Sequence, residues 1–234
     1  MALLPTQRSL RKLADKAIAE HSGRFFKTAK GQYGEGDLFL GIRVPVLRKQ
    51  VALFRDMSLE DCLELLKSRY HEERLFALLL LVDKFSRGTE SEQKRIYDAY
   101  LGHTRFINNW DLVDSSAHLI VGEYLKTRNT RPLSTLAKSA SLWERRIAMI
   151  ATFCFIRNGE FVEALKIATL LLNDEHDLIH KAVGWMLREI GNRDKQTEVD
   201  FLQQHYRTMP RTMLRYAIEK FPETQRRGYL NGSI

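Results

Sequence analysis

The spacing of apolar residues predicts helices along almost the whole chain. Five segments open with polar residues and continue with apolar residues three and four positions apart, the spacing of one helix face. These segments are 71–85, 109–125, 142–156, 176–190 and 209–221. Shorter amphipathic segments lie between them, at 59–67, 91–101, 130–138 and 159–172. The alternating runs that are typical of strands are scarce, so the pattern predicts an all-α protein.

The five segments also recur at a nearly constant distance. Their starts are roughly 33 to 38 residues apart, which is the period of paired-helix repeats. Such repeats bury their apolar faces only by stacking, so we expect one α-solenoid domain over residues 1–234. The second helix of each pair is expected to line a concave, basic surface. A two-domain all-α protein is the alternative, but no Pro-, Gly- or Ser-rich boundary separates two halves.

Composition narrows the class of protein further. Hydrophobic residues make up 44% and charged residues 28%, which is typical of a globular chain. The two cysteines, Cys62 and Cys154, lie in apolar helical patterns and are expected to be buried, reduced thiols, as suits a cytoplasmic protein. No apolar run approaches the roughly 18 residues of a membrane span, and the N-terminus has no signal-peptide pattern.

The charge balance permits a polyanionic partner. The chain has 37 Lys and Arg against 29 Asp and Glu, a formal charge of +8, which also fits a basic surface that serves only solubility. Lys27 and Lys30 lie in a glycine-rich stretch, 25–37, that lacks the Gly-Lys-Ser/Thr ending of a P-loop. This stretch is either a plain loop between two helices or a loop whose lysines contact a phosphate backbone.

Two acids stand near the start of the segment at 109–125. Asn108 or Asn109 can cap the helix, and Asp111 then falls in the first turn, where the helix dipole explains it. Asp114 lies one turn deeper and shares a face with Trp110, four residues before it. A carboxylate on such a face needs compensation, so Asp114 is either a functional acid or a salt-bridged structural one.

The next two long segments carry arginines and tryptophans at similar heights in the repeat. Stacked repeats would bring Asp114, Arg146 and Trp185 together on the concave wall, with Arg188 three residues after Trp185. Taken singly, each residue has a plainer explanation. Arg146 fits a surface ion pair, and Trp143 fits the core better than a site.

Four passages together resemble the DNA alkylation repair family, the AlkD-like DNA glycosylases built from HEAT-like repeats. They are Asn109–Ser115, Trp143–Arg146, Lys181–Glu189 and Phe39–Pro45, and the resemblance extends from about residue 25 to about residue 221. It implies that Asp114 is the catalytic aspartate and that Trp110 and Trp185 face the deoxyribose of the damaged nucleotide.

The resemblance also implies a substrate and a mode of binding. Family members excise cationic alkylated purines, such as 3-methyladenine and 7-methylguanine, without flipping the base, as a step of base excision repair. The expected partner is therefore double-stranded DNA carrying alkylated bases, bound by a monomer. The residues expected to contact its backbone are Arg145, Arg146, Lys181, Arg188, Lys27 and Lys30.

The residue types suit this chemistry. A cationic purine is a good leaving group, so a carboxylate that stabilises the sugar cation suffices, and no metal or other cofactor is expected. The sequence departs from the family pattern in having fewer aromatic residues at 175–180 and Asn109 before Trp110, which predicts weaker or narrower lesion handling. Two alternatives remain: a non-catalytic HEAT-like scaffold that binds DNA, and a solenoid that binds other proteins.

Overall fold

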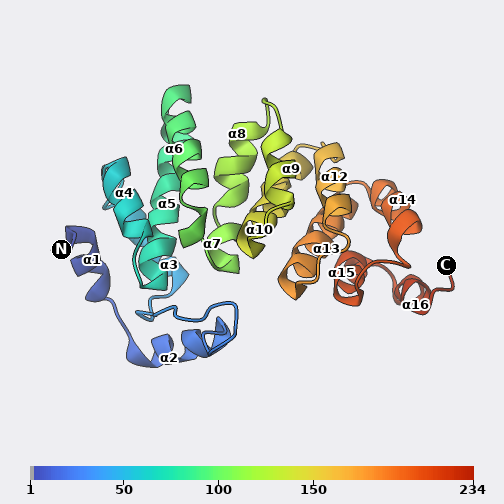
Figure 1. The fold of residues 1–234 in the computed structure, drawn as a ribbon, viewed down its shortest axis with the longest axis horizontal. Helices are drawn as coiled ribbons and strands as arrows, with labels where there is room; N and C mark the ends of the chain where they lie inside the picture. The colour runs from blue at the N-terminus through green and yellow to red at the C-terminus, as the bar shows by residue number, and fades with distance from the viewer. Residues whose placement is uncertain (1–2) are drawn as a thin grey trace. The chain divides into compact units, whose positions relative to one another are not determined.

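A computed structural model describes residues 3–234, and within them every regular element is a helix (Figure 1). The first elements are α1 (Pro5–Arg11), α2 (Lys16–Phe25), α3 (Val44–Val51), α4 (Leu59–Leu66), α5 (His71–Arg87), α6 (Glu90–Gly102), η1 (Thr104–Phe106) and α7 (Trp110–Asp114). They are followed by η2 (His118–Gly122), α8 (Glu123–Leu125), α9 (Arg131–Ala137), α10 (Leu142–Ala151), α11 (Phe153–Arg157), α12 (Val162–Leu170) and α13 (Asp177–Gly191). The last elements are α14 (Lys195–His205), α15 (Arg211–Ala217), η3 (Ile218–Lys220) and α16 (Glu223–Asn231). The predicted all-α class is confirmed.

The helices form two compact units. The N-terminal unit comprises residues 1–116 and the C-terminal unit comprises residues 117–234. That the whole chain is one continuous domain stays a prediction, as does the concave basic surface.

The N-terminal unit is built around α5. Figure 1 shows α5 between α4 and α6, and it also packs against α3 and α7. All side chains from His71 to Leu81 are buried, because this helix is enclosed on every side rather than along one stripe. The apolar run of the sequence is thus explained by its central position.

The C-terminal unit stacks helix pairs in sequence order. The helix η2 packs on α10, α10 on α13, and α13 on α15, while α9, α12 and α14 flank them. Gly184 permits the close approach of α13 and α15, since a Cβ there would lie 2.4 Å from the carbonyl oxygen of Met213. This stacking agrees with the predicted α-solenoid of helical repeats.

Two predicted helices are interrupted. The segment 109–125 is not one α-helix: it breaks after Asp114 and continues as the π-helix η2. The Ser116 hydroxyl donates to the Leu112 carbonyl, and Gly122 lies so close to Ala151 that a Cβ would be 2.3 Å from its carbonyl oxygen. The segment 142–156 likewise divides at Thr152, whose hydroxyl donates to the Met149 carbonyl. Side-chain bonds to backbone carbonyls and close packing therefore override a helical apolar pattern here.

Both cysteines are buried and free, as predicted, and burial raises the pKa of Cys62 to about 11. Among residues 3–234, no helix combines the length and apolar character that crossing a membrane requires.

Candidate active site

Trp110 opens α7 and is held by aromatic neighbours from the end of α2 and from the loop that follows it. Asn109 caps the helix, as predicted, and its side-chain oxygen accepts from the Trp110 N–H at 2.8 Å. The indole stacks on Phe26 with ring centroids 5.3 Å apart and meets Phe25 edge-on at 5.9 Å. Phe26 also stacks on Phe39 at 5.2 Å. One face of the indole is thus supported, while Phe25 is 56% exposed beside it.

Asp114 ends α7, four residues after Trp110. Its side chain is half-buried, and it lies close enough to the enclosed Tyr100 hydroxyl to affect its titration. Burial raises the pKa of Tyr100 and the Asp114 charge raises it further, while the hydrogen bond with Ser116 lowers it. The Asp114 carboxylate therefore lies at the edge of an apolar region, where a negative charge acts more strongly than in water.

Asp111 has a partner that its place in the first turn did not reveal. One carboxylate oxygen accepts from the Leu112 N–H at 2.9 Å, as expected near a helix start. The other accepts from Nε2 of His71 at 2.8 Å. The opposite ring nitrogen of His71 donates to Asp37 at 3.1 Å, and Arg74 donates to the same carboxylate at 2.7 Å. We call these four residues the His71 cluster.

The His71 cluster is a buried set of two acids and two cations. Side-chain exposures are 2% for His71, 5% for Asp37, 5% for Arg74 and 15% for Asp111. Burial alone lowers the pKa of His71, but the charge and hydrogen bond of Asp111, with the bond to Asp37, raise it to about 9. Burial conversely raises the pKa of Asp37, and the hydrogen bond from His71 and the Arg74 charge lower it on balance. The imidazole is therefore an imidazolium at neutral pH.

The first turn of α5 fixes other segments in the same way. The Glu72 carboxylate accepts from the backbone N–H groups of Leu40, Gly41 and Ile42 at 2.9, 2.7 and 3.2 Å. Glu73 accepts from Arg11 at 2.8 Å, which ties α1 to α5. In the sequence, charged residues at the start of an otherwise apolar helix were the only indication of these contacts. A helix start that is exposed to solvent has the same pattern, so the sequence could not distinguish the two.

Trp185 lies on α13 in the C-terminal unit and is also fixed by neighbours. Its ring centroid is 6.0 Å from that of Phe153, and its N–H donates to Glu189 at 3.3 Å. His118 meets the same phenylalanine edge-on at 5.5 Å. The indole is half-buried, so part of its surface is available to a ligand.

The predicted arginines and Lys181 of the C-terminal unit all make internal contacts. Arg146 is 5% exposed and donates to the Leu178 carbonyl, and Arg145 binds Asp174 at 2.6 Å. Arg188 pairs with Glu219. Lys181 lies 2.6 Å from the Asp177 carboxylate. Their binding of phosphate stays a prediction, as does the convergence of Asp114, Arg146 and Trp185.

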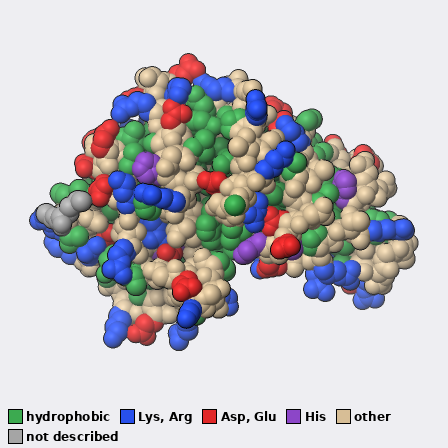
Figure 2. Space-filling model, viewed as in Figure 1, with side chains coloured by type: hydrophobic (Ala, Val, Ile, Leu, Met, Phe, Trp, Pro, Cys, Tyr) green, Lys and Arg blue, Asp and Glu red, His purple; other side chains and the backbone are tan. Residues whose placement is uncertain are grey.

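Lys27 and Lys30 lie on the loop between α2 and α3, which confirms the loop and leaves its phosphate contact a prediction. Both side chains are exposed. Lys27 has a φ of +57°, and its carbonyl accepts from the Gly34 N–H at 3.1 Å, so this part of the loop has a defined turn. Figure 2 shows Lys and Arg side chains spread over one face of the molecule with Asp and Glu among them.

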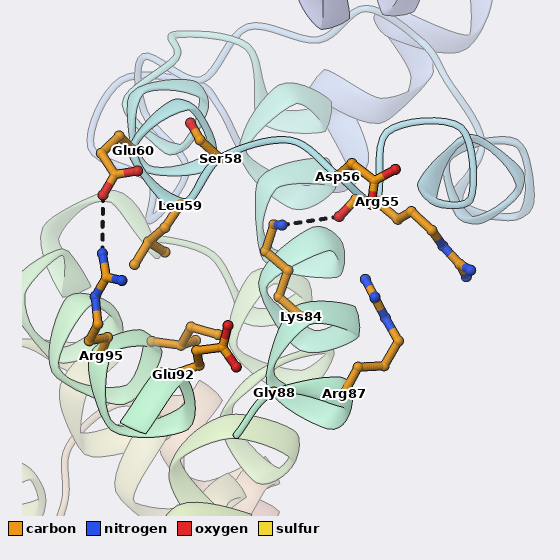
Figure 3. A pocket seen from close by; sticks show the side chains of 11 residues that line it. Arg55, Asp56, Ser58, Leu59, Glu60, Lys84, Arg87, Gly88, Glu92 and Arg95 are labelled. Atoms are coloured by element: carbon orange, nitrogen blue, oxygen red, sulfur yellow. Dashed lines mark hydrogen bonds and ion pairs between the residues drawn. The ribbon is translucent and has the colours of Figure 1, made fainter. Parts of the chain in front are cut away.

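A separate hollow of about 410 Å³ lies between α4, α5 and α6 (Figure 3). Its lining includes four cations, but each is engaged. Lys84 donates to the Arg55 carbonyl at 3.0 Å, Arg95 pairs with Glu60 at 3.3 Å, and Arg55 and Arg87 both face Asp83. It contains none of the predicted site residues, and its charges are already balanced.

Comparison with known proteins identifies the family. No curated protein matches the chain. A solved structure described as a predicted DNA alkylation repair enzyme from Enterococcus faecalis has the same fold, with a TM-score of 0.68 and 15% identity, over 90% of this chain and 97% of that one. The family model for the DNA alkylation repair enzyme matches residues 6–221. The chain belongs to the DNA alkylation repair enzyme family.

Proposed function

We propose that the protein is a DNA glycosylase that removes cationic alkylated purines, of the 3-methyladenine and 7-methylguanine type, from double-stranded DNA without flipping the base. It acts as a monomer in the cytoplasm. Membership of the alkylation repair family supports a role in repair. The observation that carries the proposal is the pairing of Trp110 and Asp114 on one short helix, with the indole fixed by Phe26.

The reaction requires little more than charge stabilisation. In a cationic purine the bond from C1′ of the deoxyribose to the base breaks with its electron pair going to the base, which leaves neutral. The sugar then carries positive charge, and water adds its oxygen to C1′ and releases a proton. The half-buried Asp114 carboxylate would stabilise that charge and orient the water.

The tryptophans suit the same cation. The electron-rich face of an indole attracts positive charge, more strongly where water is excluded. Trp110 is supported by Phe26, and Trp185 by Phe153 and Glu189, so neither has to be ordered when DNA binds.

Backbone binding would involve the basic side chains. Arg188 must exchange Glu219 for a phosphate, whereas the exposed Lys27 and Lys30 need no such exchange. Contacts of this kind give register rather than sequence preference and weaken as salt rises.

The decisive experiment is release of 7-methylguanine from methylated duplex DNA. Wild type should release the base, and Asp114→Asn should reduce the single-turnover rate by about 100-fold or more while DNA binding is kept. Asp98→Asn is the matched control, because Asp98 is an exposed acid of the same unit on α6. Salt-sensitive DNA binding with no base release, unchanged in Asp114→Asn, would instead identify a non-catalytic DNA-binding scaffold.

A further inference from the structure

His71 contacts the proposed site by two routes. Its Nε2–H donates to Asp111, the residue next to Trp110 and three before Asp114 on α7. Its ring packs against Phe26 at 4.8 Å, and the Phe26 ring stacks on Trp110. One route is a charged hydrogen bond and the other is a stack of rings, and both end on α7.

At its other ring nitrogen, His71 is held by the loop between α2 and α3 and by α5. Nδ1–H donates to Asp37, which also binds Arg74, and Phe39 stacks on the imidazole at 4.7 Å and 20°. The ring is therefore fixed in its plane by two carboxylates, and it packs against Phe26 and Phe39, whose rings also contact each other. A side chain held on all these sides transmits a defined position to its neighbours rather than following them.

We infer that His71 is a positioning residue for the reaction: bonded to Asp111 and packed on Phe26, it holds Trp110 and Asp114 in register. The inference rests on the proposed function. His71 itself need not touch DNA, since its side chain is 2% exposed. Small displacements of reacting groups can cost a large factor in rate, so loss of this support is expected to slow base release.

The positioning role of His71 depends on the charge of its imidazole. The charged groups that face it are Asp37 from the loop, Asp111 from α7 and Arg74 from its own helix. A neutral imidazole donates from only one nitrogen, and its other nitrogen then presents a lone pair to a carboxylate. Because the pKa of His71 is raised to about 9, both hydrogen bonds are present at neutral pH, and one of them is lost above that value.

His71→Phe tests the inference, because it keeps a ring in contact with Phe26 and Phe39 and removes both N–H donors. The single-turnover rate of 7-methylguanine release should fall about 10- to 100-fold, with unchanged affinity for undamaged duplex. Leu47→Ala is the matched control: Leu47 is fully buried on α3, which packs on α5, so stability falls while the rate stays. An unchanged rate in His71→Phe, or an equal loss in Leu47→Ala, overturns the inference.

Asp111→Asn supplies a second variant if His71→Phe does not fold, because it keeps the bond between His71 and Asp37. It should slow release as well. Where His71→Phe does fold, the double variant should be no slower than the slower single variant, since both changes break one connection. Multiplying rate losses would show that His71 does not act through Asp111.

The pH profile separates positioning from a merely structural role. On the same DNA substrate, the ratio of wild-type to His71→Phe rates should be constant near neutral pH and fall towards one above about pH 9. A ratio that does not change with pH would contradict a positioning role for the charged imidazole.

If wild type releases no base, the proposed function fails. Fluorescence then still tests whether His71 positions Trp110. With Trp143→Phe and Trp185→Phe, Trp110 is the only tryptophan of the chain. Iodide should quench it more strongly in His71→Phe, and above about pH 9 in the background protein, but not in Leu47→Ala. Equal quenching in the presence and absence of His71 overturns the positioning role whatever the activity.

Discussion

Raising the pH from neutral should destabilise the N-terminal unit through His71. The folded pKa of His71 is raised from 6.5 to about 9, so between these values the folded state binds a proton that the unfolded state has released. The stabilisation is complete below pH 6.5 and is lost as the pH rises through about 9. Each pH unit corresponds to about 1.4 kcal/mol, so the free energy of unfolding should fall by roughly 3 kcal/mol across this window.

Urea denaturation of wild type and His71→Phe at several pH values measures this loss. Trp110 fluorescence, with Trp143 and Trp185 replaced by Phe, reports the N-terminal unit alone. The difference in unfolding free energy between the two proteins should shrink from pH 7 to pH 9.5. A difference that stays constant would refute the assignment of a charged, doubly bonded His71.

His176→Asn is the matched histidine control for that titration. The pKa of His176 is lowered, chiefly by burial, so the ring is neutral above pH 7 in both the folded and the unfolded state. Its replacement should leave the pH dependence between 7 and 9 unchanged. Asn also keeps an oxygen that can accept the Leu178 N–H, the bond that His176 makes at the start of α13.

Two further predictions concern packing and DNA binding in the C-terminal unit. Gly184→Ala should lower the free energy of unfolding by about 1–3 kcal/mol in thermal or urea melts, because its Cβ would meet the Met213 carbonyl oxygen at 2.4 Å. Gly102→Ala, where a Cβ meets nothing within 4 Å, should not destabilise. Arg188→Ala should weaken duplex binding and reduce the slope of log affinity against log salt by about 0.9. Glu219→Gln should strengthen binding by releasing Arg188 from its ion pair, and an unchanged slope and affinity in both variants would show that Arg188 does not contact DNA.

The sequence was sufficient for the helices whose limits are set locally. The helix α5 begins at His71 and α13 begins just after its cap His176, both as predicted. These starts could be predicted because the polar cap and the apolar helix face that follows it are close together in sequence. The break between α7 and η2 was missed. Besides the local bond from Ser116 to Leu112, it involves the contact of Gly122 with Ala151, which are far apart in sequence, and no local periodicity encodes that contact.

The same distinction separates the correct and incomplete parts of the site prediction. The helix start explained the cap of Asn109 and the place of Asp111 correctly. It could not reveal the bond of Asp111 to His71, because the two residues are 40 positions apart. A local explanation that satisfies one carboxylate oxygen leaves the second oxygen unaccounted for, and that second oxygen carries the long-range contact.

The contact with His71 also bears on which acid of α7 would serve the proposed reaction. The Asp111 charge is compensated by a buried imidazolium 2.8 Å away, and a carboxylate engaged in this way is poorly placed to stabilise a sugar cation. Asp114 is one turn further along the same helix, is half-buried, and contributes to the raised pKa of the enclosed Tyr100. The two acids therefore predict different losses: Asp114→Asn removes charge stabilisation at the reacting centre, whereas Asp111→Asn loosens the support of Trp110. If Asp111→Asn proved the more damaging change, the roles of the two acids would have to be exchanged.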